Sequence, residues 1–196
     1  CSSDLLRENS ILDGKLEPTN EGYALAKIVS QKLCEYISLD INKKYKTVIP
    51  CNLYGKYDDF LPESSHMIPA VINKIHEAKK NSFDTVEIWG DGLARREFML
   101  ASSFADFIFY AIKNFSNMPQ NLNVGLGEDY NINQYYYEIA KVIGYNGTFE
   151  NNLSKPIGMK QKLVNIDKLS IFGWSNKISL EDGIKETYSF YVENIN

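Results

Sequence analysis

Tyr23-Ala24-Leu25-Ala26-Lys27 lies just inside a predicted helix that begins near Asn20 and runs to about Asn42. Residues four apart on a helix share a face, so the Tyr23 phenol and the Lys27 ammonium project side by side. A fixed neighbouring cation favours the phenolate, which would let the phenol exchange a proton near neutrality. Taken alone, a tyrosine and a lysine at this spacing are more often a packed ring and a solvated cation. The stretch therefore indicates a proton-transfer site only if other residues support it.

The composition is that of an ordinary globular protein of one domain, or one and a fraction. The chain has 196 residues, of which 44% are apolar and 23% charged, and its net charge is -4. No basic patch suits nucleic acid, and no apolar run approaches the roughly 18 residues of a membrane span. Cys1, Cys34 and Cys51 lack the spacing of a disulfide framework or a metal site, so we expect no metal and a cytoplasmic location.

Short strand-like runs alternate with helical segments, which predicts an α/β fold. We expect strands at 46–51, 86–89, 121–125 and 147–150, and helices at 20–42, 102–115, 130–144 and 178–193, with a further helix capped by Ser64 or Ser65. Residues 1–16 are expected to form a surface loop. Asn52–Gly55 is expected to be a loop after a strand, the place where α/β proteins bind ligands.

Further motifs follow Tyr23 and Lys27 in order: NLYG at 52–55, SSHMIPA at 64–70, WGDGLARREF at 89–98 and NVGLGEDYNI at 123–132. With them the chain resembles the extended short-chain dehydrogenases/reductases that act on nucleotide sugars. Within that superfamily, LEPTNEGYALAK, NLYGKYDDF, SSHMIPA and SKPIGMKQKL are similar to the GDP-L-fucose synthase family, and the resemblance runs from about residue 8 to 194.

The resemblance implies the C-terminal part of a Rossmann-type parallel sheet together with a smaller α/β substrate-binding lobe. Residues 1–60 would belong to the NADP-binding Rossmann domain, and 99–125 would return to it. Residues 61–98 and 126–196 would form mainly the substrate-binding lobe.

The resemblance also implies an NADPH-dependent enzyme that epimerises a GDP-4-keto-6-deoxy sugar at C3 and C5 and then reduces C4. Tyr23 would protonate the alkoxide forming at C4, Lys27 would assist it and hold the nicotinamide ribose, and His66 would be an acid in the proton exchange. The cofactor NADP(H) would contact Tyr23, Lys27, Pro50, Cys51, Asn52, Leu53 and His66. The substrate would contact Asn52, Lys74, Trp89, Arg96 and Lys162. A homodimer through the helix at 20–42 is the expected assembly.

The chain departs from that family at several positions. The family's second epimerisation residue is a cysteine in a G-S-S-C segment, whereas Cys1-Ser2-Ser3 has another order and lies too close to Tyr23, so we expect that segment before Cys1. Ile157 stands where the family has an aspartate, and Lys74 where it has an arginine. No G-x-x-G-x-x-G follows a strand, so we expect this chain to be inactive without a preceding half-domain.

Two other functions stay open. A related nucleotide-sugar 4-epimerase or 4,6-dehydratase would share Tyr23 and Lys27, although a 4-epimerase has no need of the second acid at His66. A non-catalytic nucleotide-sugar-binding fragment is favoured by the missing glycine fingerprint. Which GDP-sugar is used stays open too.

Overall fold

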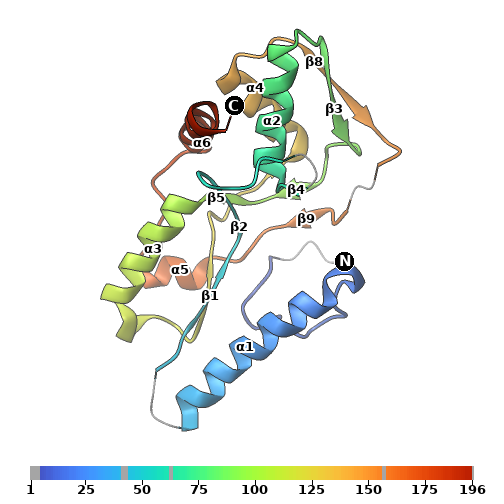
Figure 1. The fold of residues 1–196 in the computed structure, drawn as a ribbon. Helices are drawn as coiled ribbons and strands as arrows, with labels where there is room; N and C mark the ends of the chain where they lie inside the picture. The colour runs from blue at the N-terminus through green and yellow to red at the C-terminus, as the bar shows by residue number, and fades with distance from the viewer. Residues whose placement is uncertain (1–4, 41–43, 62–63, 156–157, 196) are drawn as a thin grey trace.

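The computed structural model describes residues 5–40, 44–61, 64–155 and 158–195, and it has the α/β architecture expected from the sequence (Figure 1). The helices are η1 (Pro18–Asn20), α1 (Glu21–Asp40), α2 (Met67–Lys80), α3 (Ala101–Lys113), η2 (Phe115–Asn117), α4 (Ile132–Ile143), α5 (Asp167–Phe172) and α6 (Leu180–Asn194). The strands are β1 (Thr47–Pro50), β2 (Asn52–Tyr54), β3 (Thr85–Trp89), β4 (Arg95–Arg96), β5 (Phe98–Leu100), β6 (Asn121–Val124), β7 (Tyr130–Asn131), β8 (Thr148–Asn152) and β9 (Gln161–Lys162).

Strands that are far apart in the sequence pair in parallel. β1 pairs with β6, β2 with β5, and β3 with β8. A fourth, smaller sheet has the order β7-β4-β9, in which β4 is antiparallel to β7 and parallel to β9. Parallel pairing requires a long crossover, and the helices between the strands supply it.

Two hydrophobic cores form around these strands. One gathers β1, β6, α3 and α5, and its buried side chains include Phe107, Leu122 and Phe172. The other gathers α2, α4, α6, β3 and β8 around Ile72 and Ile139, and Figure 1 shows these elements together at the top of the molecule. Residues 164–174 pack in the first core, beside the segments that the resemblance assigns to the Rossmann domain.

Helix α1 is long but contributes little to either core. Its buried residue is Gln31, while Tyr23, Leu25, Val29, Leu33, Tyr36 and Leu39 are exposed. Its contacts with the sheet include a hydrogen bond from the Asn121 side chain to Glu35. Most of the large apolar side chains of α1 therefore face outward in the described residues.

Several local predictions were wrong. Neither Ser64 nor Ser65 caps α2, because the N-cap is His66, and the Ser64 hydroxyl bonds to Asp59 instead. Most of residues 5–16 form the exposed loop that the sequence predicts, but the loop is tied to the fold: Leu6 bridges to Val164, and the Glu8 side chain is buried, where it accepts a hydrogen bond from the Asn123 backbone N–H.

The sequence patterns also missed short elements. Asn52–Tyr54 is strand β2 rather than a loop, Tyr130–Asn131 is strand β7 rather than helix, and β4, β5, β9 and α5 were not expected. Elements of two to six residues are too short to show a period, so tertiary pairing decides them.

None of the helices in the described ranges is both long enough and apolar enough to cross a bilayer. The same residues contain no group of three or more His, Cys, Asp or Glu side chains that could hold a metal ion.

Candidate active site

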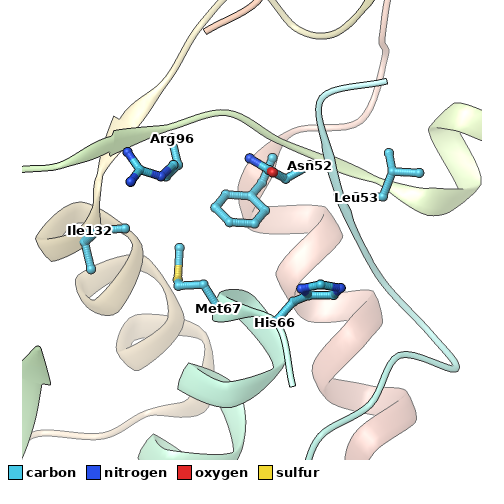
Figure 2. A pocket seen from close by; sticks show the side chains of 7 residues that line it. Asn52, Leu53, His66, Met67, Arg96 and Ile132 are labelled. Atoms are coloured by element: carbon cyan, nitrogen blue, oxygen red, sulfur yellow. The ribbon is translucent and has the colours of Figure 1, made fainter. Parts of the chain in front are cut away.

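A cavity of about 360 Å³ lies where β2, the start of α2 and the small sheet β7-β4-β9 meet. Its lining residues come from distant parts of the chain and are Asn52, Leu53, His66, Met67, Arg96, Phe98 and Ile132. Figure 2 shows the Met67 side chain between Arg96 and His66, with Asn52 opposite. The cavity therefore combines an imidazole, an amide and a guanidinium with an apolar wall.

His66 owes its position to the start of α2. It is the N-cap residue, and its extended backbone (φ -68°, ψ 168°) makes no side-chain capping hydrogen bond. Its backbone carbonyl instead accepts the N–H of Ala70 at 3.0 Å, as the first turn requires. The exposed imidazole makes no capping hydrogen bond to the helix and lines the cavity instead.

Arg96 is a half-buried cation without a carboxylate partner among the described residues. Its Nη1 donates to the backbone carbonyls of Arg95 and Met159, each at 2.7 Å. Burial lowers the pKa of Arg96 from its ordinary value. An anion in the cavity would offset this cost, because a guanidinium binds carboxylate or phosphate oxygens strongly once both are desolvated.

A second cavity, of about 290 Å³, adjoins the first and shares Asn52 with it. Pro50, Cys51 and Lys162 line it, together with Glu97 and residues of the N-terminal segment such as Leu6 and Arg7. The Asn52 side chain donates to the Glu97 carbonyl at 2.8 Å, which fixes Asn52 at the junction. Of the predicted cofactor and substrate residues, these two cavities bring together Pro50, Cys51, Asn52, Leu53, His66, Arg96 and Lys162.

Cys51 forms part of the cavity wall and is unsuited to proton abstraction. Its side chain is buried, and burial, followed by the charge of Glu97, raises the pKa of the thiol far above its usual range. A thiol must ionise to act as a base or a nucleophile. Cys51 is therefore part of the cavity wall rather than a reactive group.

Glu97 is a buried carboxyl that ties the site together. Oε1 accepts the backbone N–H groups of Leu126 at 2.5 Å and Gly127 at 2.9 Å, and Oε2 accepts that of Val164 at 3.1 Å. Burial raises its pKa, although these hydrogen bonds act in the opposite direction. A Cβ at Gly125 would lie 2.4 Å from Glu97 Oε1, so only glycine permits this approach.

The structure leaves Tyr23 and Lys27 outside both cavities. The Lys27 Nζ lies 5.4 Å from the centre of the Tyr23 ring, so the expected pairing along the helix is present. The ring is nevertheless 69% exposed, and neither residue is among those lining the cavities.

Lys74 and Trp89 also lie apart from both cavities. The Lys74 ammonium donates to the Glu87 carbonyl on β3, and burial lowers the pKa of Lys74. Trp89, at the end of β3, is 61% exposed, with the Lys155 Nζ 5.1 Å from its ring centre. Cys1-Ser2-Ser3, which we do not expect to be the family's catalytic segment, and the substituted position Ile157 lie outside the described residues.

Sequence reasoning missed Met67, Phe98 and Ile132 as cavity residues. It also missed Glu97, Arg95 and Asp129, whose side chains hold neighbouring segments together by hydrogen bonds. The motif WGDGLARREF contains Arg95 and Glu97, so its two adjacent arginines were an available signal. Asp129 sits in NVGLGEDYNI, where nothing local distinguishes it from the neighbouring exposed Glu128.

Residues 3–132 match the model of the NAD dependent epimerase/dehydratase family. The chain is 59% identical to a GDP-L-colitose synthase of Yersinia pseudotuberculosis, covering 100% of this chain and 64% of that protein. It is 48% identical to a GDP-L-fucose synthase of Azorhizobium caulinodans, covering 98% of this chain and 62% of that protein.

A solved structure of a GDP-sugar enzyme has a similar fold. The GDP-mannoheptose C4 reductase from Campylobacter jejuni, solved with NADP bound, superposes with a TM-score of 0.84 at 28% identity, covering 97% of this chain and 63% of that one. This chain thus spans a little under two thirds of the length of these relatives. On the extent of the family match, together with the fold around the two cavities, the chain belongs to the NAD dependent epimerase/dehydratase family.

Proposed function

We propose that this chain is the substrate-binding and proton-transfer part of an NADPH-dependent epimerase/reductase acting on a GDP-4-keto-6-deoxy sugar. The observation that carries the proposal is the cavity that the exposed His66 imidazole lines together with Asn52 and Arg96, a cation with no carboxylate partner among the described residues. The names of the two relatives, GDP-L-colitose synthase and GDP-L-fucose synthase, support the choice of a GDP-sugar.

Epimerisation requires an acid at one face of the sugar. The C–H bonds next to a ketone are acidic because the enolate is stabilised, so one group removes a proton and another returns it from the opposite face. His66 is suited to return it, because it lines the cavity and histidine is the side chain that most often transfers protons in catalysis. Cys51 does not supply the opposing base, since burial raises the pKa of its thiol.

The diphosphate is assigned to the two cations of the small sheet. Arg96 lines the first cavity and Lys162 the second, and their register pairs them across β4 and β9. No carboxylate of the described residues forms an ion pair with either cation, so both can neutralise an anionic ligand. The sugar would then extend from the cations past Met67 toward His66.

The cofactor is assigned to the second cavity and the adjoining carboxyl end of β1. Pro50, Cys51, Asn52 and Leu53 would contact it there, and NADPH would supply the hydride that reduces C4. Tyr23 would donate its phenolic proton to the C4 oxygen, and Lys27, next to it on α1, would help to hold the nicotinamide ribose.

The proposal is tested with the full-length protein, NADPH and GDP-4-keto-6-deoxymannose in deuterated water. We expect loss of NADPH absorbance, together with deuterium at C3 or C5 of the product by NMR. Absence of deuterium exchange with intact reduction would identify a plain 4-reductase. If the protein binds the GDP-sugar tightly but shows neither deuterium exchange nor loss of NADPH absorbance, a non-catalytic binding protein would be favoured.

A further inference from the structure

Two adjacent arginines on β4 have opposite roles. Arg95 donates from Nε to Asp129 Oδ1 at 2.7 Å, and its Nη2 lies 2.5 Å from the same oxygen and 2.6 Å from the Asp129 carbonyl. Arg96 has only backbone carbonyls as partners among the described residues. Successive residues of a strand point to opposite faces, so one arginine is tied to the protein and the other is turned to the cavity.

Asp129 joins two neighbouring strands. Its side chain is 3% exposed, and its second oxygen accepts the Gln161 Nε2 at 2.6 Å. Arg95 of β4 and Gln161 of β9 are register partners, so one buried carboxylate holds facing residues of both strands. A buried carboxylate with a guanidinium and an amide as donors has strong, directional hydrogen bonds.

The backbone alone secures this register weakly. β4 and β9 are two residues long, and the N–H of Arg95 donates to the Lys160 carbonyl at 2.8 Å where they meet. A slip of one residue in a strand moves every side chain to the other face. Such a slip of β9 would carry Lys162 away from the face it shares with Arg96.

We propose that the cluster Arg95–Asp129–Gln161 positions the cation pair Arg96 and Lys162 to receive the two phosphates of a nucleoside diphosphate. This inference rests on the proposed function, because it takes the diphosphate site as given and assigns what holds it in place. Asp129 and Arg95 are positioning residues, since they act through the strand register and do not contact the ligand.

The test uses isothermal calorimetry on the full-length protein, with GDP and GMP as probes. Asp129→Asn should weaken GDP binding about ten-fold and GMP binding less than about two-fold, because only GDP needs both cations in register. KM for the GDP-sugar should rise while kcat stays within about two-fold. The variant would weaken binding of the ground state and of the transition state equally, and would leave the chemical step unchanged. Glu181→Gln, which breaks an exposed ion pair with Lys141 and Lys185 away from the cavities, is the matched control and should change neither probe.

A double-variant comparison separates positioning from general destabilisation. In an Arg96→Met/Lys162→Met background, Asp129→Asn should add less than about two-fold to the loss of GDP affinity, because the cations that it positions are gone. Should Asp129→Asn fail to fold, Gln161→Leu removes a single bond of the cluster and should weaken GDP binding selectively in the same way.

Other results would contradict one or both proposals. Unchanged GDP affinity in both Asp129→Asn and Gln161→Leu, or an equal loss with and without the two cations, would overturn the inference while leaving the proposed function intact. A wild-type protein that binds GDP no better than GMP would contradict the diphosphate site itself, and both proposals would fall with it.

Discussion

Helix α1 and the small sheet β7-β4-β9 carry their candidate residues in different ways. On α1, Tyr23 is 69% exposed, and the residue beside its ring is Lys27, from the same helix. On the sheet, the Arg96 carbonyl accepts the hydroxyl of the buried Tyr135 at 2.9 Å, and Arg95 is bonded to the buried Asp129. Substitutions on α1 should therefore act on chemistry or assembly at little cost in stability. Substitutions around the sheet should act on stability and on ligand position.

The largest effect is expected at Tyr23. In the full-length protein, Tyr23→Phe should lower kcat for reduction by about 10²–10⁴-fold, because the phenol acts only on charge that develops in the transition state. GDP-sugar binding should stay within a few-fold, and the melting temperature should hold. Tyr36→Phe, at a tyrosine of α1 that is 65% exposed, is the matched control. Turnover at the wild-type level in Tyr23→Phe would remove this residue from the mechanism.

His66 should separate the two stages of the reaction. His66→Asn should slow deuterium incorporation at C3 or C5 by about 100-fold, while reduction of an already epimerised intermediate changes by a few-fold. The comparison variant is His76→Asn, because the His76 Nδ1 lies 3.1 Å from the Tyr188 hydroxyl within the packed helices. That variant should affect stability rather than exchange. Equal loss of both activities in His66→Asn would indicate a structural role at the start of α2.

Glu97 tests the expectation that substitutions around the small sheet act on stability. Glu97→Leu removes the acceptor of three backbone N–H groups, so the free energy of unfolding should fall by on the order of 3 kcal/mol, measured by urea denaturation. Glu97→Gln keeps one oxygen and should cost less. Glu150→Gln, at an exposed position of β8, is the control and should change little.

The pH dependence of Glu97 has a definite sign. Burial raises its pKa above the ordinary 4.5, so the folded state favours the protonated carboxyl more than the unfolded state does. Such a group stabilises the fold below its unfolded pKa and loses that contribution as pH rises through the raised value. The stability of the wild type relative to Glu97→Gln should therefore decrease as pH is raised from 4.5. A difference that grows with pH would contradict the burial argument.

The smallest effect on the single chain is expected from Tyr36→Glu on α1. Since Tyr36 is 65% exposed, a charge there should leave the fold of the chain intact. If the full-length protein is a homodimer through α1, the same charge would be buried without a partner and should shift the assembly to monomer. Light scattering at micromolar concentration measures the change, and Tyr137→Glu, at an exposed tyrosine of α4, is the control. A monomeric wild-type protein would end the dimer prediction.

The helices α1, α2, α3, α4 and α6 were predictable because each repeats apolar residues with a helical period over a dozen residues or more. Strands β1, β3 and β6 were predictable as well, because each is a short segment with apolar residues that is bounded by polar residues. His66, Arg96 and Lys162 were identified as candidates because they stand in motifs that resemble a known family. That resemblance assigned roles to residues without placing them in space.

By itself, the sequence determined the α/β class, the pairing of Tyr23 with Lys27 along one helix, and the set of residue types available for proton transfer and anion binding. Only the tertiary structure decided which of them meet. It put Asn52, His66 and Arg96 around one cavity, left Lys74 and Trp89 outside it, and buried Asp129 between β4 and β9 while its neighbour Glu128 stayed exposed. The physical reason is the sequence separation of the contacts involved. A helical period is set by contacts between residues three or four apart. The pairing of two-residue strands, and the burial of the carboxylates that hold them, depends on contacts between segments more than thirty residues apart.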